Sequence, residues 1–124
     1  MVETRKAPAG RSAEMAASAV DGIEALLRAA LAGDVSLGAT LKFVHPGADV
    51  LVIDGRKTPN EVHRRDIPAD CTVHIDPLLN LDILQGHVDQ NVAFRQGRIR
   101  IVGDLSAVTR LRPIVARQAG AVKE

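Results

Sequence analysis

The sequence has almost no aromatic side chains: its 124 residues include two phenylalanines, Phe43 and Phe94, and no tryptophan or tyrosine. Proteins that bind single-stranded nucleic acid stack successive bases on aromatic rings, and two rings give no such platform. The chain also lacks an excess of one charge, because 16 lysines and arginines are balanced by 15 acidic residues. Since a nucleic-acid partner normally requires a strongly basic face, we expect none.

Cysteine and long apolar runs are scarce as well. Cys71 is the single cysteine, so the chain can form neither an internal disulfide nor a thiolate cage around a metal ion. Residues 1–11 lack the apolar stretch of a signal peptide, and no apolar run is long enough to cross a bilayer. These absences favour a cytoplasmic location, and residues 1–11 are expected to form a disordered N-terminal tail.

A chain of this length fits one domain, because a core of this size buries roughly two thirds of the surface that the unfolded chain exposes. We expect the domain over residues 12–119 and a frayed C-terminus over residues 120–124. Its first element is a helix between Ser12, a candidate N-cap, and Gly33, a candidate C-cap. The apolar residues of this helix recur at spacings of three and four and share one face. They are Ala16, Val20, Ile23, Leu27, Ala30 and Leu31.

Short segments typical of β-strands follow, separated by turn signals rich in proline and glycine. They span residues 40–45, 48–53, 60–65 and 71–75. In the last segment Val73 and Ile75 point to one face of the pleat, whereas Thr72 and His74 point to the other. This alternation predicts an antiparallel meander with one face in water.

Two short helices are predicted next. Asp76 and Pro77 start the first, because aspartate accepts from the free amides and proline at the first position loses no needed donor. Asp89 caps the second helix, over residues 89–96, and Gly97 ends it.

A further strand and a terminal helix complete the order of an α+β domain. Residues 98–102 alternate arginine with isoleucine, which predicts a strand with Ile99 and Ile101 pointing inward. The terminal helix begins at Asp104, and Pro113 predicts a kink or break near Arg112, because proline removes a helical hydrogen bond.

The stretch from Ile83 to Asp104 resembles the sterol-carrier-protein-2 (SCP-2) family. The shared pattern is an apolar pair before a glycine, a short helix, Ala-Phe, Gln-Gly, an alternating basic and aliphatic strand, and Gly-Asp before the last helix. This chain matches it at Ile83, Leu84, Gly86, Ala93, Phe94, Gln96, Gly97, the strand 98–102, Gly103 and Asp104.

This resemblance implies an α+β, SCP-2-like fold, with a five-stranded, mainly antiparallel sheet covered on one face by helices. It also implies an apolar tunnel between the sheet and the helices. Its function would be non-catalytic binding or transfer of a lipid or other apolar small molecule such as a fatty acyl chain, without a cofactor. Arg95 stands where family members often carry a large apolar residue, which favours a generic acyl ligand over a sterol.

The residues expected to bind the ligand are those that match the motif and the apolar positions of the neighbouring elements. They are Phe43, Leu81, Leu84, Phe94, Gln96, Ile99, Ile101, Leu105, Val108, Leu111 and Ile114. The same aliphatic residues would serve equally in a filled core. Two alternatives therefore stay open: an interaction or dimerisation domain with a filled cavity that partners a lipid-pathway enzyme, and an enzyme acting on an apolar substrate.

Metal and catalytic sites are not expected. Cys71 and His74 are three residues apart on a strand and so point to opposite faces, while His63 and His74 across adjacent strands would supply only two ligands. Ser106 and Cys71 lack the motif of an activated nucleophile.

A membrane surface is expected to be contacted transiently at most. Arg110, Arg112 and Arg117 in the terminal helix could approach an anionic bilayer, but a solvated helix face is favoured.

Overall fold

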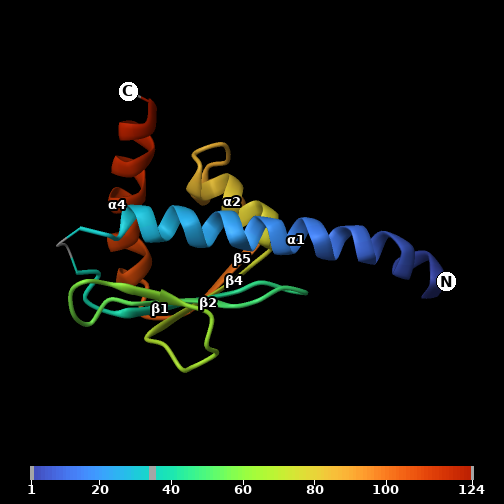
Figure 1. Ribbon diagram of the computed structural model, residues 1–124, viewed down its shortest axis with the longest axis horizontal. Coiled ribbons are helices and arrows are strands. Elements are labelled where there is room, and N and C mark those ends of the chain that lie inside the picture. The colour runs from blue at the N-terminus through green and yellow to red at the C-terminus, as the bar shows by residue number, and fades with distance from the viewer. Residues whose placement is uncertain (1, 34–35, 124) are drawn as a thin grey trace.

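The computed structural model describes the backbone of residues 2–33 and 36–123 and the side chains of residues 13–33 and 36–117. Helices lie on one side of a sheet, and the N-terminal part of the first helix extends beyond it (Figure 1). The elements follow one another as α1 (Val2–Ala30), β1 (Thr40–Val44), β2 (Leu51–Asp54), β3 (Glu61–His63), β4 (Cys71–Ile75), α2 (Pro77–Leu84), α3 (Gln90–Arg95), β5 (Ile99–Gly103) and α4 (Ser106–Lys123).

The strands form one five-stranded sheet in the order β3-β2-β1-β4-β5. The predicted α+β class and the mainly antiparallel sheet are confirmed, because only β1 and β4 pair in parallel. The predicted meander is wrong at β4, which pairs with β1 instead of β3. As a result His63 and His74 lie on strands separated by β2 and β1, and the pairing considered for them does not occur.

The crossover from β3 to β4 covers part of the sheet face opposite the helices (Figure 1). Lys42 lies on that face, between two core residues of β1, and its Nζ is 2.8 Å from Asp66 in the crossover. At the end of the crossover, next to β4, the Thr40 amide donates to the Asp70 carboxylate, and the Asp70 amide donates to Thr40 Oγ1. This face is therefore less open to water than the alternation predicted.

Helix α1 packs its predicted apolar face into the core, where Val20, Ile23 and Leu27 are fully buried. The helix begins at Val2, not at Ser12, so the segment predicted as a disordered tail is helical. The physical reason is that a helix nucleated by packing extends outward at little cost per residue.

Helix α4 runs through Pro113 to Lys123 without the predicted break near Arg112 and without the predicted frayed end. Pro113 is exposed, while Leu111 and Val115 on either side of it are buried in the core. Packing on both sides of the proline holds the helix together despite the missing hydrogen bond.

No helix among the described residues has both the length and the apolar character to span a bilayer.

Candidate functional site

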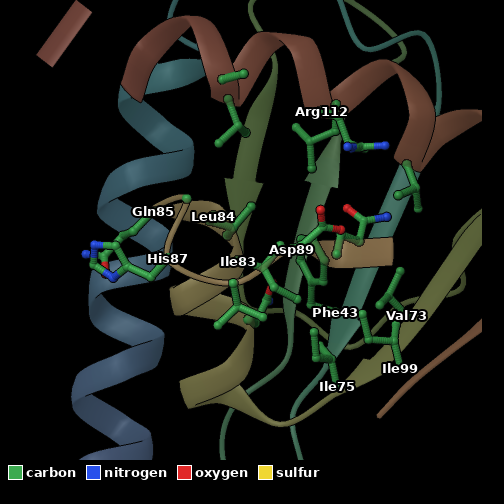
Figure 2. A pocket seen from close by; sticks show the side chains of 18 of the residues that line it. Phe43, Val73, Ile75, Ile83, Leu84, Gln85, His87, Asp89, Ile99 and Arg112 are labelled. Atoms are coloured by element: carbon green, nitrogen blue, oxygen red, sulfur yellow. The ribbon is translucent and has the colours of Figure 1, made fainter. Parts of the chain in front are cut away.

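A cavity of about 500 Å³ lies between the sheet, the segment from α2 to α3, and α4 (Figure 2). It is partly open to solvent, and most of its lining is aliphatic. A volume in this range is typical of small-molecule sites.

The floor of the cavity is made by the inward face of β1, β4 and β5. Phe43 pairs with Val73, which pairs in turn with Ile101, and Ile75 pairs with Ile99 one step along the strands. Because side chains alternate along a strand, these positions all point toward the helices. The register therefore brings the floor together from three separate stretches of sequence.

One wall comes from the end of α2 and the turn after it. Asp76 starts α2 as predicted, because its carboxylate accepts from the amides of Leu78 and Leu79 at 3.0 and 3.1 Å. Ile83 and Leu84 then lie at the C-terminal end of the helix and line the cavity. Gly86 follows with a φ of +85°, a conformation that favours glycine, and turns the chain back along the opening.

The opposite wall is α4. Val108, Leu111 and Val115 are spaced by three and four residues, so they share one helical face, and all three are buried and line the cavity.

Asn80, a buried polar residue of the cavity lining, pairs with the buried His45. Asn80 lines the cavity, and its side-chain amide is 3.0 Å from His45 Nε2, while His45 Nδ1 is 2.9 Å from the Asp49 carbonyl oxygen. A carbonyl only accepts, so Nδ1 donates and Nε2 accepts from Asn80, which requires a neutral ring. Burial lowers the pKa of His45 and so favours the same neutral state.

The titratable side chains among the described cavity residues are those of His87, Asp89 and Arg112. His87 Nδ1 is 3.7 Å from an Asp82 carboxylate oxygen. Asp89 caps α3 as predicted and accepts from the amides of Asn91 and Val92 at 2.7 and 3.3 Å. All three side chains are exposed, so the titratable groups lie at the rim, and the interior is mainly aliphatic with Asn80 as a buried polar side chain.

Six of the residues predicted to bind the ligand come together in this cavity: Phe43, Leu84, Ile99, Ile101, Val108 and Leu111. Five lie outside it: Leu81, Phe94, Gln96, Leu105 and Ile114.

Phe94 lies outside because α3 buries the preceding residue, Ala93, against the core. Neighbours on a helix point about 100° apart, so Phe94 turns outward and is 52% exposed. Gln96 and Arg95 are exposed at the end of the same helix, and Arg95 therefore does not line the cavity.

The other three residues outside the cavity have local reasons of their own. Leu105 precedes the first turn of α4 and is 56% exposed. Leu81 packs toward α1 at Gly22, where an added Cβ would lie 3.5 Å from its methyl groups. Ile114 is half-buried against the core.

Several lining residues were absent from the sequence-based set. The sequence did indicate that Val73 and Ile75 point inward, because the two alternate with polar residues along their strand. The sequence did not indicate Asn80 or Arg112 as lining residues, because each reaches the cavity through the tertiary arrangement alone, whereas the turn 85–90 lies within the stretch that resembles the SCP-2 family.

No group of three or more His, Cys, Asp or Glu side chains within the described part of the chain is placed to hold a metal ion. Cys71 is buried in the core, and burial raises the pKa of its thiol.

The model of the SCP-2 sterol transfer family matches residues 9–116. Among curated proteins, none matches the chain.

Solved structures with the same fold include three informative examples. The sterol carrier protein domain 2 of Helicoverpa armigera is 24% identical, with a TM-score of 0.56 and coverage of 68% of this chain and 72% of that chain. A UbiJ-SCP2 ubiquinone synthesis protein is 23% identical, with a TM-score of 0.60 and coverage of 77% and 86%. Sterol carrier protein 2 of Aedes aegypti, solved in complex with the C16 fatty acid palmitate, is 21% identical, with a TM-score of 0.54 and coverage of 63% and 73%. At these identities the likeness shows the fold alone.

Proposed function

The chain belongs to the SCP-2 sterol transfer family, and we propose that it binds a lipid, or another apolar molecule such as a fatty acyl chain, in the cavity between sheet, α2 and α4. The observation that carries this proposal is the cavity itself, about 500 Å³ with a mainly aliphatic interior and its titratable side chains at the rim. The Aedes aegypti relative of the same fold was solved with palmitate.

The energetics favour a ligand with a long apolar portion. Each buried methylene contributes about 0.8 kcal/mol, so ten contribute roughly 8 kcal/mol. Association costs about 4–15 kcal/mol in lost translational and rotational freedom. Chain length therefore decides whether binding is measurable, and short apolar molecules should bind poorly.

Binding can be tested by displacement of a fluorescent acyl probe and by native mass spectrometry of the purified protein. The discriminating variant is Leu84→Trp, which fills the cavity from its half-buried wall. The matched control is Leu105→Trp, the same change at an exposed leucine outside the cavity. We expect Leu84→Trp to weaken probe binding at least about ten-fold, roughly the loss of two methylene contacts, and Leu105→Trp to leave it unchanged. Equal binding by both variants, or no probe binding by the wild type, would refute the proposal.

We propose that the domain itself is not an enzyme. Ser106 Oγ donates to Asp104 at 2.6 Å at the exposed start of α4, outside the cavity. The Cys71 thiol is buried and its pKa is raised, which disfavours the reactive thiolate. Both observations support a binding role, and the lone buried cysteine also supports the proposed cytoplasmic location.

A second candidate function is an interaction domain, either a homodimer or a partner of an enzyme of lipid metabolism. It is favoured by Phe94, Val102 and Leu105, each more than half exposed beside the edge strand β5. One solved structure with the same fold is described as a ubiquinone synthesis protein. Sedimentation analysis over a range of concentrations tests the homodimer, and a mass that stays monomeric excludes it.

A further inference from the structure

Arg112 differs from the arginine nearest to it on α4. Arg110 donates to the Leu37 carbonyl at 2.7 Å and to Ser106 Oγ at 3.1 Å, so it ties α4 to the segment before β1. Arg112 lines the cavity, and within the described part of the chain it has no hydrogen bond and no ion pair. Its guanidinium is thus free to bind a group from outside the protein.

The position of Arg112 matches the boundary between the apolar interior and water. Leu111, the preceding residue, is buried in the core, whereas Arg112 is exposed. Figure 2 shows its side chain extending from α4 toward the space above the sheet floor. An amphiphile whose apolar tail lies against Phe43 and Val73 would bring its polar end to this rim.

We propose that Arg112 binds the anionic head group of an amphiphilic ligand, so that the cavity selects ionised lipids over neutral ones of the same chain length. This inference rests on the proposed function. A guanidinium presents paired donors that fit the oxygens of a carboxylate or a phosphate, which is the chemistry shared by fatty acids and alkyl phosphates.

The other titratable side chains at the rim favour the same position for the head group. The Asp89 carboxylate already accepts from two backbone amides of α3 and repels an anion. His87 lies within ion-pair distance of Asp82 on α2. The head group is therefore directed to the α4 side of the opening.

The test compares three ligands with the same twelve-carbon chain: dodecanoate, dodecyl phosphate and dodecanol. Each displaces an uncharged fluorescent acyl probe at pH 8, with the two anions below their micellar concentrations and dodecanol below its solubility limit. The variants are Arg112→Gln, which removes the charge, and Arg112→Lys, which keeps it. Arg117→Gln is the matched control, because Arg117 is exposed on the same helix and lies outside the cavity.

We expect Arg112→Gln to weaken binding of the anions about two- to five-fold, as for an exposed ion pair, and to leave dodecanol unchanged. Arg112→Lys should keep part of the preference, Arg117→Gln should keep all of it, and added salt should reduce it. A loss confined to dodecanoate or to dodecyl phosphate supports the proposal and identifies the head group. Unchanged anion affinity in Arg112→Gln, or an equal loss for all three ligands, would overturn this proposal alone. Failure of every ligand and of the probe to bind the wild type would overturn the proposed function as well.

Discussion

The two ends of the space between the sheet and the helices are packed differently. Beneath α1, Ile23, Leu27, Leu41 and Ile53 are fully buried and form a dry core. At the end of α2, Ile83 and Leu84 are only half-buried, and a cavity of about 500 Å³ separates them from α4 and the floor. One region holds the fold together, whereas the other leaves room for a ligand.

This difference predicts that the stability of the domain depends more on the core beneath α1 than on the half-buried wall of the cavity. The buried leucines and isoleucines under α1 lose both transfer free energy and packing contacts when they are shortened. A side chain that already borders an open space has fewer contacts to lose. The same substitution should therefore have very different effects in the two regions.

The largest effect is expected for Leu27→Ala in the dry core. Leu27 is fully buried, so the substitution leaves a closed void and should lower the free energy of unfolding by about 2–5 kcal/mol. Urea denaturation followed by circular dichroism measures the change. A loss below about 1 kcal/mol would show that this region repacks and that it is not more tightly packed than the cavity wall.

An intermediate effect is expected from pH at His45, whose partner Asn80 lines the cavity. Burial lowers the pKa of folded His45 below its ordinary value of 6.5, so below that pH the unfolded chain binds the proton more readily. The contribution to stability is complete above pH 6.5 and is lost as the pH falls toward the folded pKa, with a slope of at most about 1.4 kcal/mol per pH unit.

Unfolding free energies measured between pH 7.5 and pH 5.5 test this dependence, with His45→Gln as the comparison because glutamine does not titrate. The decline should be present in the wild type and largely absent from the variant. If the unfolding free energies of the wild type and the variant change with pH in the same way, groups other than His45 cause the dependence.

The smallest effect is expected for Leu84→Ala, the same substitution as Leu27→Ala but at the cavity wall. Leu84 is half-buried, so its loss widens an existing opening and should cost less than about 1 kcal/mol of stability. Affinity for an acyl probe should fall as the wall contacts are lost. A stability loss equal to that of Leu27→Ala would mean that the cavity wall is part of the stabilising core.

Local sequence patterns predicted most of the elements, because their signals act over a few residues. Asp76 and Asp89 accept from the first amides of their helices as their positions predicted. The alternation at residues 98–102 predicted β5, with Ile99 buried and Arg100 exposed. The heptad-like spacing from Ala16 to Leu31 predicted the buried face of α1.

The predictions failed where a longer-range arrangement decided the outcome. The parallel pairing of β1 with β4 joins Leu41 to Cys71, and no turn signal between neighbouring segments could indicate it. Pro113 does not end α4, because the residues around it are held by packing. Phe94 matches the family motif, yet it points to solvent because Ala93 takes the buried position.

Local sequence patterns were thus enough to predict the order of the elements, the N-caps of α2 and α3 and the inward face of most elements, because hydrogen bonding at helix ends and hydrophobic periodicity are local. Only the tertiary structure decided which aliphatic side chains meet in a filled core and which surround a cavity, and it alone brought Arg112 to the rim. Core and cavity are built from the same residue types. The difference between them lies in the distances between elements far apart in the chain, which composition and spacing do not encode.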